Sequence, residues 1–190
     1  MKINPVRAYS IEEILFFLFG IISVLHFFFL KFVPSLDGPQ HLYTSSVIVE
    51  LVKSNDTIKE FFTFNDLIVG NWVGHFLLSL FNFFLSAQFA EKIFLVVYVF
   101  GIAYAFRYLI KSILGYVPYH AVIIYPFAFT VLFLQGYYNY SFAFIFLFVS
   151  LGFWVRIKDH LNLKNGIIFL LLQLLLFLSH IFVFVLYGYI

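Results

Sequence analysis

Residues 14–43 read ILFFLFGIISVLHFFFLKFVPSLDGPQHLY, which is a block of about seventeen mostly apolar residues followed by a short polar stretch. A helix needs about 20 residues to cross the hydrocarbon core of a bilayer, so the block predicts a membrane-spanning helix with a polar exit. Lys2 and Arg7 precede it, as basic residues do in a secretory signal peptide. The apolar core is longer than that of a signal peptide, and Val33-Pro34-Ser35 is a poor cleavage site, so we expect an uncleaved anchor.

The composition of the whole chain points the same way. Hydrophobic residues make up 64% of the 190 residues and charged residues 11%, and the mean hydropathy is +1.03. A soluble domain of this size could not bury so much apolar surface, so we expect an all-α integral membrane protein with a single membrane domain over residues 1–190. The net charge of +2 is dispersed, without a basic run, which argues against a nucleic-acid partner. Because the chain has no cysteine, its chemistry must use oxygen and imidazole groups.

Five further apolar blocks follow the first one. They are Val73–Leu85, Ile93–Phe106, Val117–Leu134, Tyr137–Val155 and Ile167–Ile190. The block at Val73 is short and contains Ser79 and Asn82, so it could be re-entrant or lie along the interface instead of crossing. None of the six blocks contains an acidic residue.

The distribution of basic residues favours five spans with a cytoplasmic N-terminus, because Lys and Arg concentrate near span ends on the cytoplasmic side. If residues 73–85 do not cross, the cytoplasmic set is Lys2, Arg7, Arg107, Lys111, Arg156, Lys158 and Lys164, and Lys31 and Lys92 are outside. A model of six spans with the N-terminus outside leaves three of these nine basic residues on the extracytoplasmic side, whereas the five-span model leaves two there. The five-span arrangement makes residues 31–92 one long extracytoplasmic loop.

That first loop must be organised by helices of its own. Pro39 suits the first turn of a helix, and HLYTSSVIVELVKS after it has the apolar spacing of an amphipathic helix resting on the membrane surface. Asn55-Asp56 and Asn65-Asp66 break the chain before the aromatic segment that starts at Trp72. We therefore expect two or three surface helices in the loop.

Polar residues at the mouth of the first span are the first candidates for chemistry. The Asp37 carboxylate could take a proton from an acceptor hydroxyl or amine, or coordinate a hard cation such as Mg²⁺ or Mn²⁺. The bland alternative is that Asp37 only caps the helix that begins at Gly38-Pro39. His41 follows four residues later, on the same helix side, where it could bind phosphate or share the cation. It could equally be a surface imidazole at headgroup level.

Further along the chain, more polar residues recur near span ends. Asn71 and His75 form a second i, i+4 pair beside Trp72, whose plain interpretation is an interfacial anchor. His180 lies in the last apolar block, where an imidazole needs a partner, so it could line a site or be satisfied locally. The residues that we expect to contact substrate are Gln40, His41, Asn71, Trp72, His75, Asn139 and His180. His26 and His120 have the character of structural residues.

Two stretches together resemble a known family. SLDGPQHLY places an Asp and an amphipathic helix after the first span, and GNWVGHFLLSLFNFFLSAQFAEKIFLVVYVFGIAYAFRYL leads from an aromatic-rich surface helix into a span and a basic turn. This arrangement resembles the N-terminal part of the GT-C membrane glycosyltransferases, and SLDGPQHLY is similar to the Asp-x-Pro-x-His form of some bacterial members. The resemblance implies that Asp37 activates an acceptor or binds a divalent cation while a sugar moves from a polyprenyl-phosphate donor, outside the cytoplasm.

The chain departs from the family pattern at a second landmark. Many members place a carboxylate in the next external loop, whereas this chain has QGYYNYSF there. Gln135 and Asn139 can hydrogen-bond a sugar or an acceptor, but they cannot act as bases or replace a charged metal ligand. This difference weakens the expectation of a cation-dependent mechanism and leaves the expected fold untouched.

The sequence ends inside an apolar run, which residue 190 closes. We therefore expect an N-terminal fragment of a longer enzyme that is inactive by itself. A small-solute transporter, with Trp72–Leu85 lining its path, is the main alternative, although the chain shows no internal repeat. A membrane protein without enzymatic activity is the third reading. The expected partners are the lipid bilayer, a lipid-linked sugar donor and an acceptor that the sequence does not identify.

Overall fold

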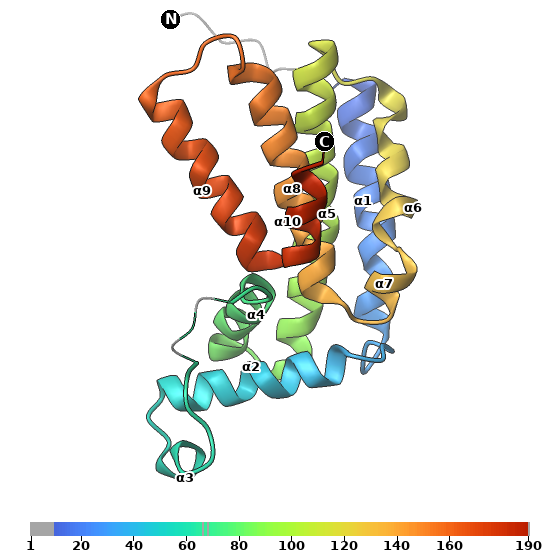
Figure 1. Cartoon of the computed structure of the whole chain (residues 1–190). Helices are drawn as coiled ribbons and strands as arrows, with labels where there is room; N and C mark the ends of the chain where they lie inside the picture. Colours follow the sequence, from blue (N-terminus) through green and yellow to red (C-terminus); the bar gives the residue numbers. More distant parts are fainter. Residues whose placement is uncertain (1–9, 66, 68, 190) are drawn as a thin grey trace, which may run out of the picture.

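The computed structural model describes residues 10–65, 67 and 69–189 of the chain, and every regular element in that part is helical. Three helices are long and apolar enough to cross a membrane: α1 (Ile11–Phe29), α5 (Ala87–Leu114) and α8 (Tyr138–Ile157). They run side by side as the centre of the molecule (Figure 1). The predicted all-α class is confirmed and the three apolar helices fit a membrane protein, whereas the expected number of five spans stays a prediction.

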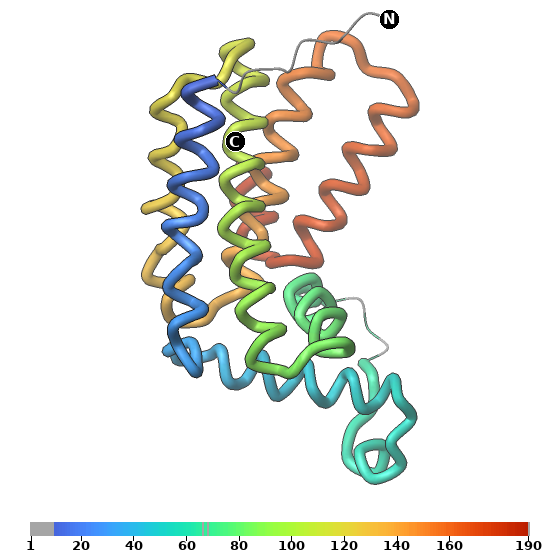
Figure 2. The backbone as a smooth tube through the Cα atoms, turned by 180° about the vertical axis from the view of Figure 1, so that it is seen from behind, coloured from blue at the N-terminus to red at the C-terminus, as the bar shows by residue number. Residues whose placement is uncertain are grey.

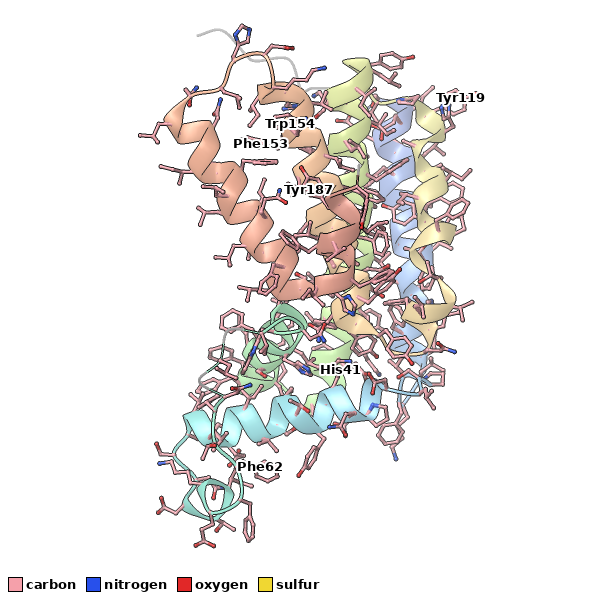
Figure 3. All side chains as sticks on the ribbon, in the orientation of Figure 1. His41, Phe62, Tyr119, Phe153, Trp154 and Tyr187 are labelled. Carbon is pink, nitrogen blue, oxygen red and sulfur yellow. The ribbon has the colours of Figure 1, made fainter. Side chains whose placement is uncertain are left out.

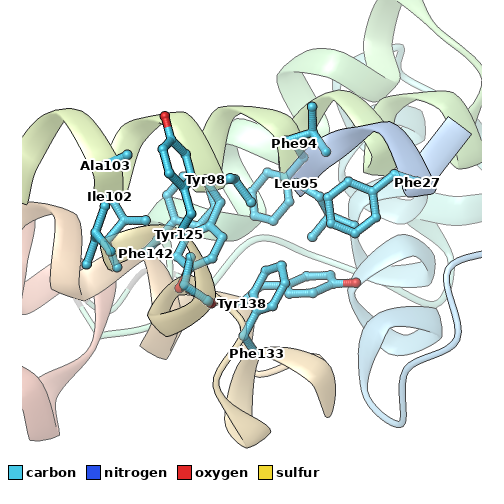
Figure 4. Packing of buried hydrophobic residues seen from close by; sticks show 14 of the residues in the cluster. Phe27, Phe94, Leu95, Tyr98, Ile102, Ala103, Tyr125, Phe133, Tyr138 and Phe142 are labelled. Atoms are coloured by element: carbon cyan, nitrogen blue, oxygen red, sulfur yellow. Dashed lines mark hydrogen bonds between the residues drawn. The ribbon is translucent and has the colours of Figure 1, made fainter. Parts of the chain in front are cut away.

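Aromatic side chains fill the space between the three long helices. Phe94 and Tyr98 of α5 pack on Phe142 of α8, with ring centroids 4.5 and 5.6 Å apart. Tyr98 also donates a hydrogen bond to the Ala128 carbonyl at 2.9 Å, which satisfies its buried hydroxyl. Figure 4 shows this cluster from close by. The main hydrophobic core is therefore one cluster of packed side chains between the long helices, and many of its members are aromatic.

Both ends of α1 are fixed by hydrogen bonds. Ser10 and Glu13 form a capping box at its start, in which each side chain accepts from the backbone N–H of the other residue. At its other end, Lys92 of α5 donates to the Leu30 carbonyl at 2.6 Å. Helix ends leave carbonyls without intrahelical partners, so Lys92 stabilises the point where α1 gives way to the first loop.

The block expected at Val117–Leu134 does not form one continuous helix. It consists of a 3₁₀ turn at Tyr119–Ile123, α6 (Ile124–Ala128) and α7 (Val131–Leu134). Pro118 precedes the first piece, and Thr130 caps α7 by accepting from the Phe133 N–H. In Figures 1 and 2 this broken segment runs along α1 for most of its length.

The last expected block, Ile167–Ile190, also bends. α9 (Leu163–Ser179) ends before His180, whose backbone is extended at φ −163° and ψ 120°. α10 (Ile181–Tyr187) then turns back and packs against α8 and α9. The fold in the chain at His180 is visible near the centre of Figure 1. The polar pair Ser179-His180 therefore marks the bend, in a run whose other polar residue is Gln173.

The first loop is helical, as predicted, and lies across one end of the bundle. α2 (Gly38–Val52) runs nearly perpendicular to the long helices (Figures 1 and 2). α3 is a single turn at Asp56–Lys59, and α4 (Val73–Phe84) packs between α2 and the start of α5. With 12 residues, α4 is about 18 Å long, well short of a bilayer core of about 30 Å. It therefore cannot cross as a single straight helix.

Candidate functional site

Asp37 is held by backbone contacts with the chain segment that links α7 to α8. Its N–H donates to the Gln135 carbonyl at 2.8 Å. Gly136 has a φ of +93°, and a Cβ there would lie 2.6 Å from the Gly38 nitrogen. Only glycine tolerates both this conformation and this close approach. The QG pair therefore presses the start of α2 against the start of α8.

The Asp37 side chain is not used as a helix cap. Asp37 stands at the N-cap position of α2, but its carboxylate makes no capping hydrogen bond. Instead, its Oδ2 atom lies 3.3 Å from Nε2 of His41, and the side chain is 37% exposed. Of the two roles that the sequence left open, capping is wrong. The carboxylate is positioned by His41 and remains accessible.

His41, which is buried, and His75, which is partly buried, form a pair of imidazoles beside Asp37. Their ring centroids are 4.7 Å apart, and His41 stacks on Tyr138 of α8 at 5.1 Å. Figure 3 shows His41 pointing from α2 into the bundle. Burial lowers the pKa of His41, although the Asp37 carboxylate and the Gly136 backbone oppose this effect. Burial and the nearby His41 lower the pKa of His75 to about 4. Both rings are therefore mainly uncharged at neutral pH.

A cavity of about 270 Å³ opens at this point, and we call it the Asp37 cavity. Its walls come from α2, from the loop before α4, from α4, from the start of α8 and from the bend between α9 and α10. The lining residues are Asp37, Gln40, His41, Thr44, Asn71, His75, Tyr137, Asn139, Tyr140 and His180. Seven of the eight predicted site residues are in this set, although they span most of the chain.

Trp72 is the predicted residue that lies elsewhere. Its side chain lines a neighbouring hollow of about 410 Å³, between α2 and the α3–α4 loop. Its backbone N–H donates to the Leu178 carbonyl at 2.8 Å, which ties the loop before α4 to the end of α9. Trp72 therefore helps to place Asn71 and His75 without lining the cavity itself.

The side-chain oxygen of Asn139 takes part in a structural hydrogen bond. Its Oδ1 atom accepts from the Gly74 N–H at 2.7 Å, and the residue is 5% exposed. A Cβ on Gly74 would lie 2.5 Å from that oxygen, so the glycine is what lets α4 approach α8. The amide nitrogen remains available on the cavity side. Asn139 is thus both a structural link and a donor.

Two cavity imidazoles have buried nitrogen atoms without a protein partner. They are Nδ1 of His75 and Nδ1 of His180. The His180 ring stands edge to face with Tyr140 at 5.2 Å, so its orientation is set by packing instead of a hydrogen bond. A buried polar atom without a partner is costly, and such atoms are rare in folded proteins. Both nitrogen atoms are enclosed by protein, so the fold leaves one nitrogen of each imidazole unpaired beside the cavity.

Glu91 is the residue that sequence reasoning missed. We expected the second long span to start at Ile93, without an acid, but α5 starts at Ala87 and includes Glu91. This side chain is buried, with the residue 3% exposed, and its Oε1 atom accepts from the Tyr138 hydroxyl at 2.7 Å. It therefore stands directly behind the ring that supports His41. The adjacent charges Glu91-Lys92 before an apolar run were the available signal.

Two further hollows continue from the Asp37 cavity along α2 and α4. The 410 Å³ hollow shares Gln40, Thr44, Asn71 and His75 with it. A third hollow, of about 420 Å³, shares Ile48, Phe64 and Trp72 with the second one. Apart from Ser79, the side chains of the third hollow are apolar or aromatic. The lining thus changes from polar at Asp37 to apolar at the far end of α4.

The two histidines that we expected to be structural lie outside the Asp37 cavity. His26 packs on Phe27 and Phe129, with centroids 4.1 and 5.6 Å away. Its side chain lines a separate hollow of about 190 Å³ between α1 and α8. His120 rests edge to face against Tyr119. Both residues are exposed, so the structural role that we expected for them stays a prediction.

The side chains around Asp37 offer few ligands for a metal ion. Within residues 10–65, 67 and 69–189, no group of three His, Asp, Glu or Cys residues is arranged to hold one. Asp37 and His41 supply two donors at most. Comparisons with protein-family models, curated proteins and solved structures find no match to this chain.

Proposed function

We propose that the full-length protein is a membrane glycosyltransferase that moves a sugar from a polyprenyl-phosphate-linked donor to an acceptor on the extracytoplasmic side. The observation that carries this proposal is the uncapped Asp37 carboxylate on the wall of a polar cavity, at the end of a bundle of apolar helices. A carboxylate in that place is within reach of both an aqueous acceptor and a lipid-borne donor. The resemblance of SLDGPQHLY to the GT-C motif adds the reaction type.

Asp37 acts in this proposal as the base that takes a proton from the acceptor hydroxyl or amine. The neutral His41 ring, with Nε2 at 3.3 Å from Oδ2, donates to the carboxylate and fixes its direction. Stacking on Tyr138 keeps the ring in place. A general base must be held within hydrogen-bonding reach of the proton that it removes, and this arrangement provides a fixed carboxylate with one accessible side.

A divalent cation, Mg²⁺ or Mn²⁺, fits this site only as part of a substrate complex. Mg²⁺ is commonly held by one or two carboxylates together with substrate phosphates and water, so Asp37, with His41 beside it, would provide the protein ligands. Such an ion would stabilise negative charge on the departing phosphate. The proton transfer assigned to Asp37 does not depend on it.

The proposed orientation places the N-terminus in the cytoplasm and Asp37 outside. Among the described residues, Arg107 and Lys111 lie near the end of α5, and Arg156, Lys158 and Lys164 surround the α8–α9 turn. That end of the bundle is opposite to α2 (Figure 1). Basic residues near span ends favour the cytoplasm, which supports this orientation. Lys2 and Arg7 lie outside the described residues.

The test is Asp37→Asn in the full-length gene, with the glycan or lipid-linked sugar product as the readout. Removing a general base lowers the rate by about 10²–10⁴-fold, so we expect the product to disappear. Asp56→Asn is the matched control, because Asp56 lies in the same loop but begins the exposed turn α3. Product formation that is unchanged by Asp37→Asn would contradict the proposal.

A small-solute transporter is the second candidate, and one observation favours it. The chain is broken at His180, which lines the Asp37 cavity, and broken helices beside a polar site are typical of transporters. Glu91 also corrects our expectation that the long helices contain no acid. A transport defect with normal glycans in the Asp37→Asn strain would favour this candidate over the transferase.

A further inference from the structure

Glu91 is a buried acid that the proposed mechanism does not use. It lies near the start of α5 and is 3% exposed. Its Oε1 atom accepts a hydrogen bond from the Tyr138 hydroxyl at 2.7 Å. Acidic side chains are almost never fully buried unless they are paired, and ionisable residues in membrane-spanning helices are usually functional. The partner of Glu91 therefore indicates where its role lies.

Tyr138 joins Glu91 to the candidate site. Its ring is 2% exposed and packs against Phe94 of α5, with centroids 5.3 Å apart (Figure 4). One face of the ring stacks on His41 at 5.1 Å, with 28° between the two ring planes. The Glu91 oxygen holds the hydroxyl end of this ring. Glu91 thereby fixes the surface on which His41 stacks.

The start of α2 also lies directly on the Glu91–Tyr138 pair. A Cβ built on Gly38, the first residue of α2, would lie 2.9 Å from the Tyr138 hydroxyl oxygen and 3.0 Å from Oε1 of Glu91. An acidic side chain near the N-terminus of a helix is stabilising. Because Asp37 makes no capping hydrogen bond, Glu91 is the acid that supports this end of α2 from inside the bundle, and the Asp37 side chain is left to face the cavity.

The contacts continue from Tyr138 to the Asp37 carboxylate. His41 stacks on the tyrosine ring, and its Nε2 atom lies 3.3 Å from Oδ2 of Asp37. Without the Glu91 oxygen, the buried Tyr138 hydroxyl would have to move to find another partner, because an unpaired buried hydroxyl is costly. His41 would move with the ring on which it stacks, and its contact with Asp37 would loosen.

We propose that Glu91 is a positioning residue for the Asp37 carboxylate and acts through the Tyr138 hydroxyl and the His41 ring. It supplies an acceptor oxygen and touches neither the substrate nor the proton that Asp37 removes. The consequence for product formation rests on the proposed transferase function. The positioning of His41 and Asp37 does not, so the two can be tested separately.

The experiment observes His41 by NMR in the ¹⁵N-histidine-labelled chain in phosphatidylcholine nanodiscs at neutral pH. The His41 signals are those that disappear in His41→Gln. A neutral imidazole carries its proton on one nitrogen, which is fixed by the hydrogen bonds of the ring. We expect the Nε2–H form in the unchanged chain and a shift towards a mixture of both forms in Glu91→Leu. Glu91→Gln keeps an acceptor oxygen and should leave the signals in place.

Two further variants separate positioning from a general loss of stability. Tyr138→Phe removes the hydroxyl but keeps the ring, so it should move the His41 signals as Glu91→Leu does, and combining the two should add nothing. Glu12→Leu is the matched control, because Glu12 is a buried acid that pairs with Arg107 at the opposite end of the bundle. It should lower stability and leave the His41 signals unchanged.

Unchanged His41 signals in both Glu91→Leu and Tyr138→Phe would overturn the proposal, as would an equal change in Glu12→Leu or in Glu91→Gln. If Glu91→Leu does not fold, unchanged signals in Tyr138→Phe overturn it alone. In the full-length protein, Glu91→Leu should lower product formation by about 10–100-fold, as small misplacements of catalytic groups do, and Glu91→Gln should restore it. Shifted His41 signals together with normal product in the Asp37→Asn strain would refute the transferase and leave the positioning role in place.

Discussion

The two ends of the helical bundle both bury charged groups, but they do so in opposite ways. At the end away from α2, Arg107 of α5 pairs with Glu12 of α1 at 2.5 Å, and their side chains are 18% and 11% exposed. The Arg107 guanidinium also lies over the Phe16 ring at 4.4 Å. At the α2 end, Asp37 has only a neutral imidazole as a partner and lines a cavity.

The charged groups at the two ends therefore have different roles. Those at the Arg107 end stabilise the fold, whereas the Asp37 carboxylate at the α2 end is available for chemistry. The Arg107–Glu12 pair joins two of the long helices and is enclosed by rings, so its charges compensate each other. The carboxylate of Asp37 keeps an accessible side and lines a cavity. Burial alone would not have distinguished the two ends. The presence of a cavity and the kind of partner do.

The strongest test of this comparison is to remove one member of the paired charges. Arg107→Ala leaves the Glu12 carboxylate without its cation, and breaking a buried ion pair in this way costs about 3–5 kcal/mol. We expect a free energy of unfolding in detergent that is lower by this amount. Product formation by the folded full-length protein should not change.

Arg156→Ala provides the control at the same end of the molecule. Arg156 is exposed, donates to the Ser112 hydroxyl at 2.8 Å and lies over the Tyr108 ring at 4.4 Å. Exposed interactions of this kind contribute about 1 kcal/mol or less. Equal losses of stability in the two arginine variants would show that the Arg107–Glu12 pair is not the element that holds this end together.

The second prediction concerns the glycine that presses the start of α2 against α8. Gly136→Ala places a Cβ 2.6 Å from the Gly38 nitrogen at a φ of +93°. We expect a loss of about 2–3 kcal/mol in unfolding free energy, from backbone strain and from the displacement of α2. Because Asp37 moves with α2, product formation by the full-length protein should be lost as well.

Gly115→Ala separates strain from displacement. Gly115 has a φ of +81°, but nothing lies within 4 Å of a Cβ built there. The strain of a positive φ alone costs about 1–2 kcal/mol, and product formation should remain. If Gly136→Ala behaves in the same way as Gly115→Ala, the close approach of the QG pair does not position Asp37.

Much of the fold could be predicted because apolar blocks and turn residues are local signals. The blocks led correctly to α1, α5 and α8, and Pro39 with the spacing after it led to α2. The breaks inside 117–134 and at His180 were missed. A continuous apolar run has the same composition whether the helix goes on or bends, since the bend depends on what the segment packs against.

The grouping of the candidate site residues was predicted more fully than the contacts among them. Few polar residues lie near the ends of the apolar blocks, and the alternating direction of the spans brings these residues to one end of the bundle. Seven of the eight candidate site residues therefore line one cavity. The contact between Glu91 and Tyr138 joins residues 47 positions apart in sequence. Such a pairing follows from the register of α5 against α8, which no local pattern encodes. The capping role of Asp37 was equally undecidable, because it depends on one side-chain rotamer.

The smallest predicted effect is a pH dependence of the free energy of unfolding, which arises from an imidazole at the α2 end. The pKa of His75 is about 4 in the folded protein because of burial and the proximity of His41. An unfolded histidine has a pKa of about 6.5, so the unfolded state takes up protons first as the pH falls. Stability should therefore decrease from pH 6.5 towards pH 4, by at most about 2 kcal/mol at pH 5.

His75→Gln should reduce this loss, because glutamine keeps a hydrogen-bonding group but does not titrate. The measurement is the unfolding free energy in detergent at pH 7 and pH 5. The exposed His160, in the turn after α8, supplies the control, since His160→Gln leaves His75 in place and should retain the full pH dependence. A pH dependence that survives His75→Gln would mean that the pKa of His75 is not lowered in the folded protein and that other groups carry the loss of stability. The contrast between the two ends would then rest on the accessible Asp37 carboxylate alone.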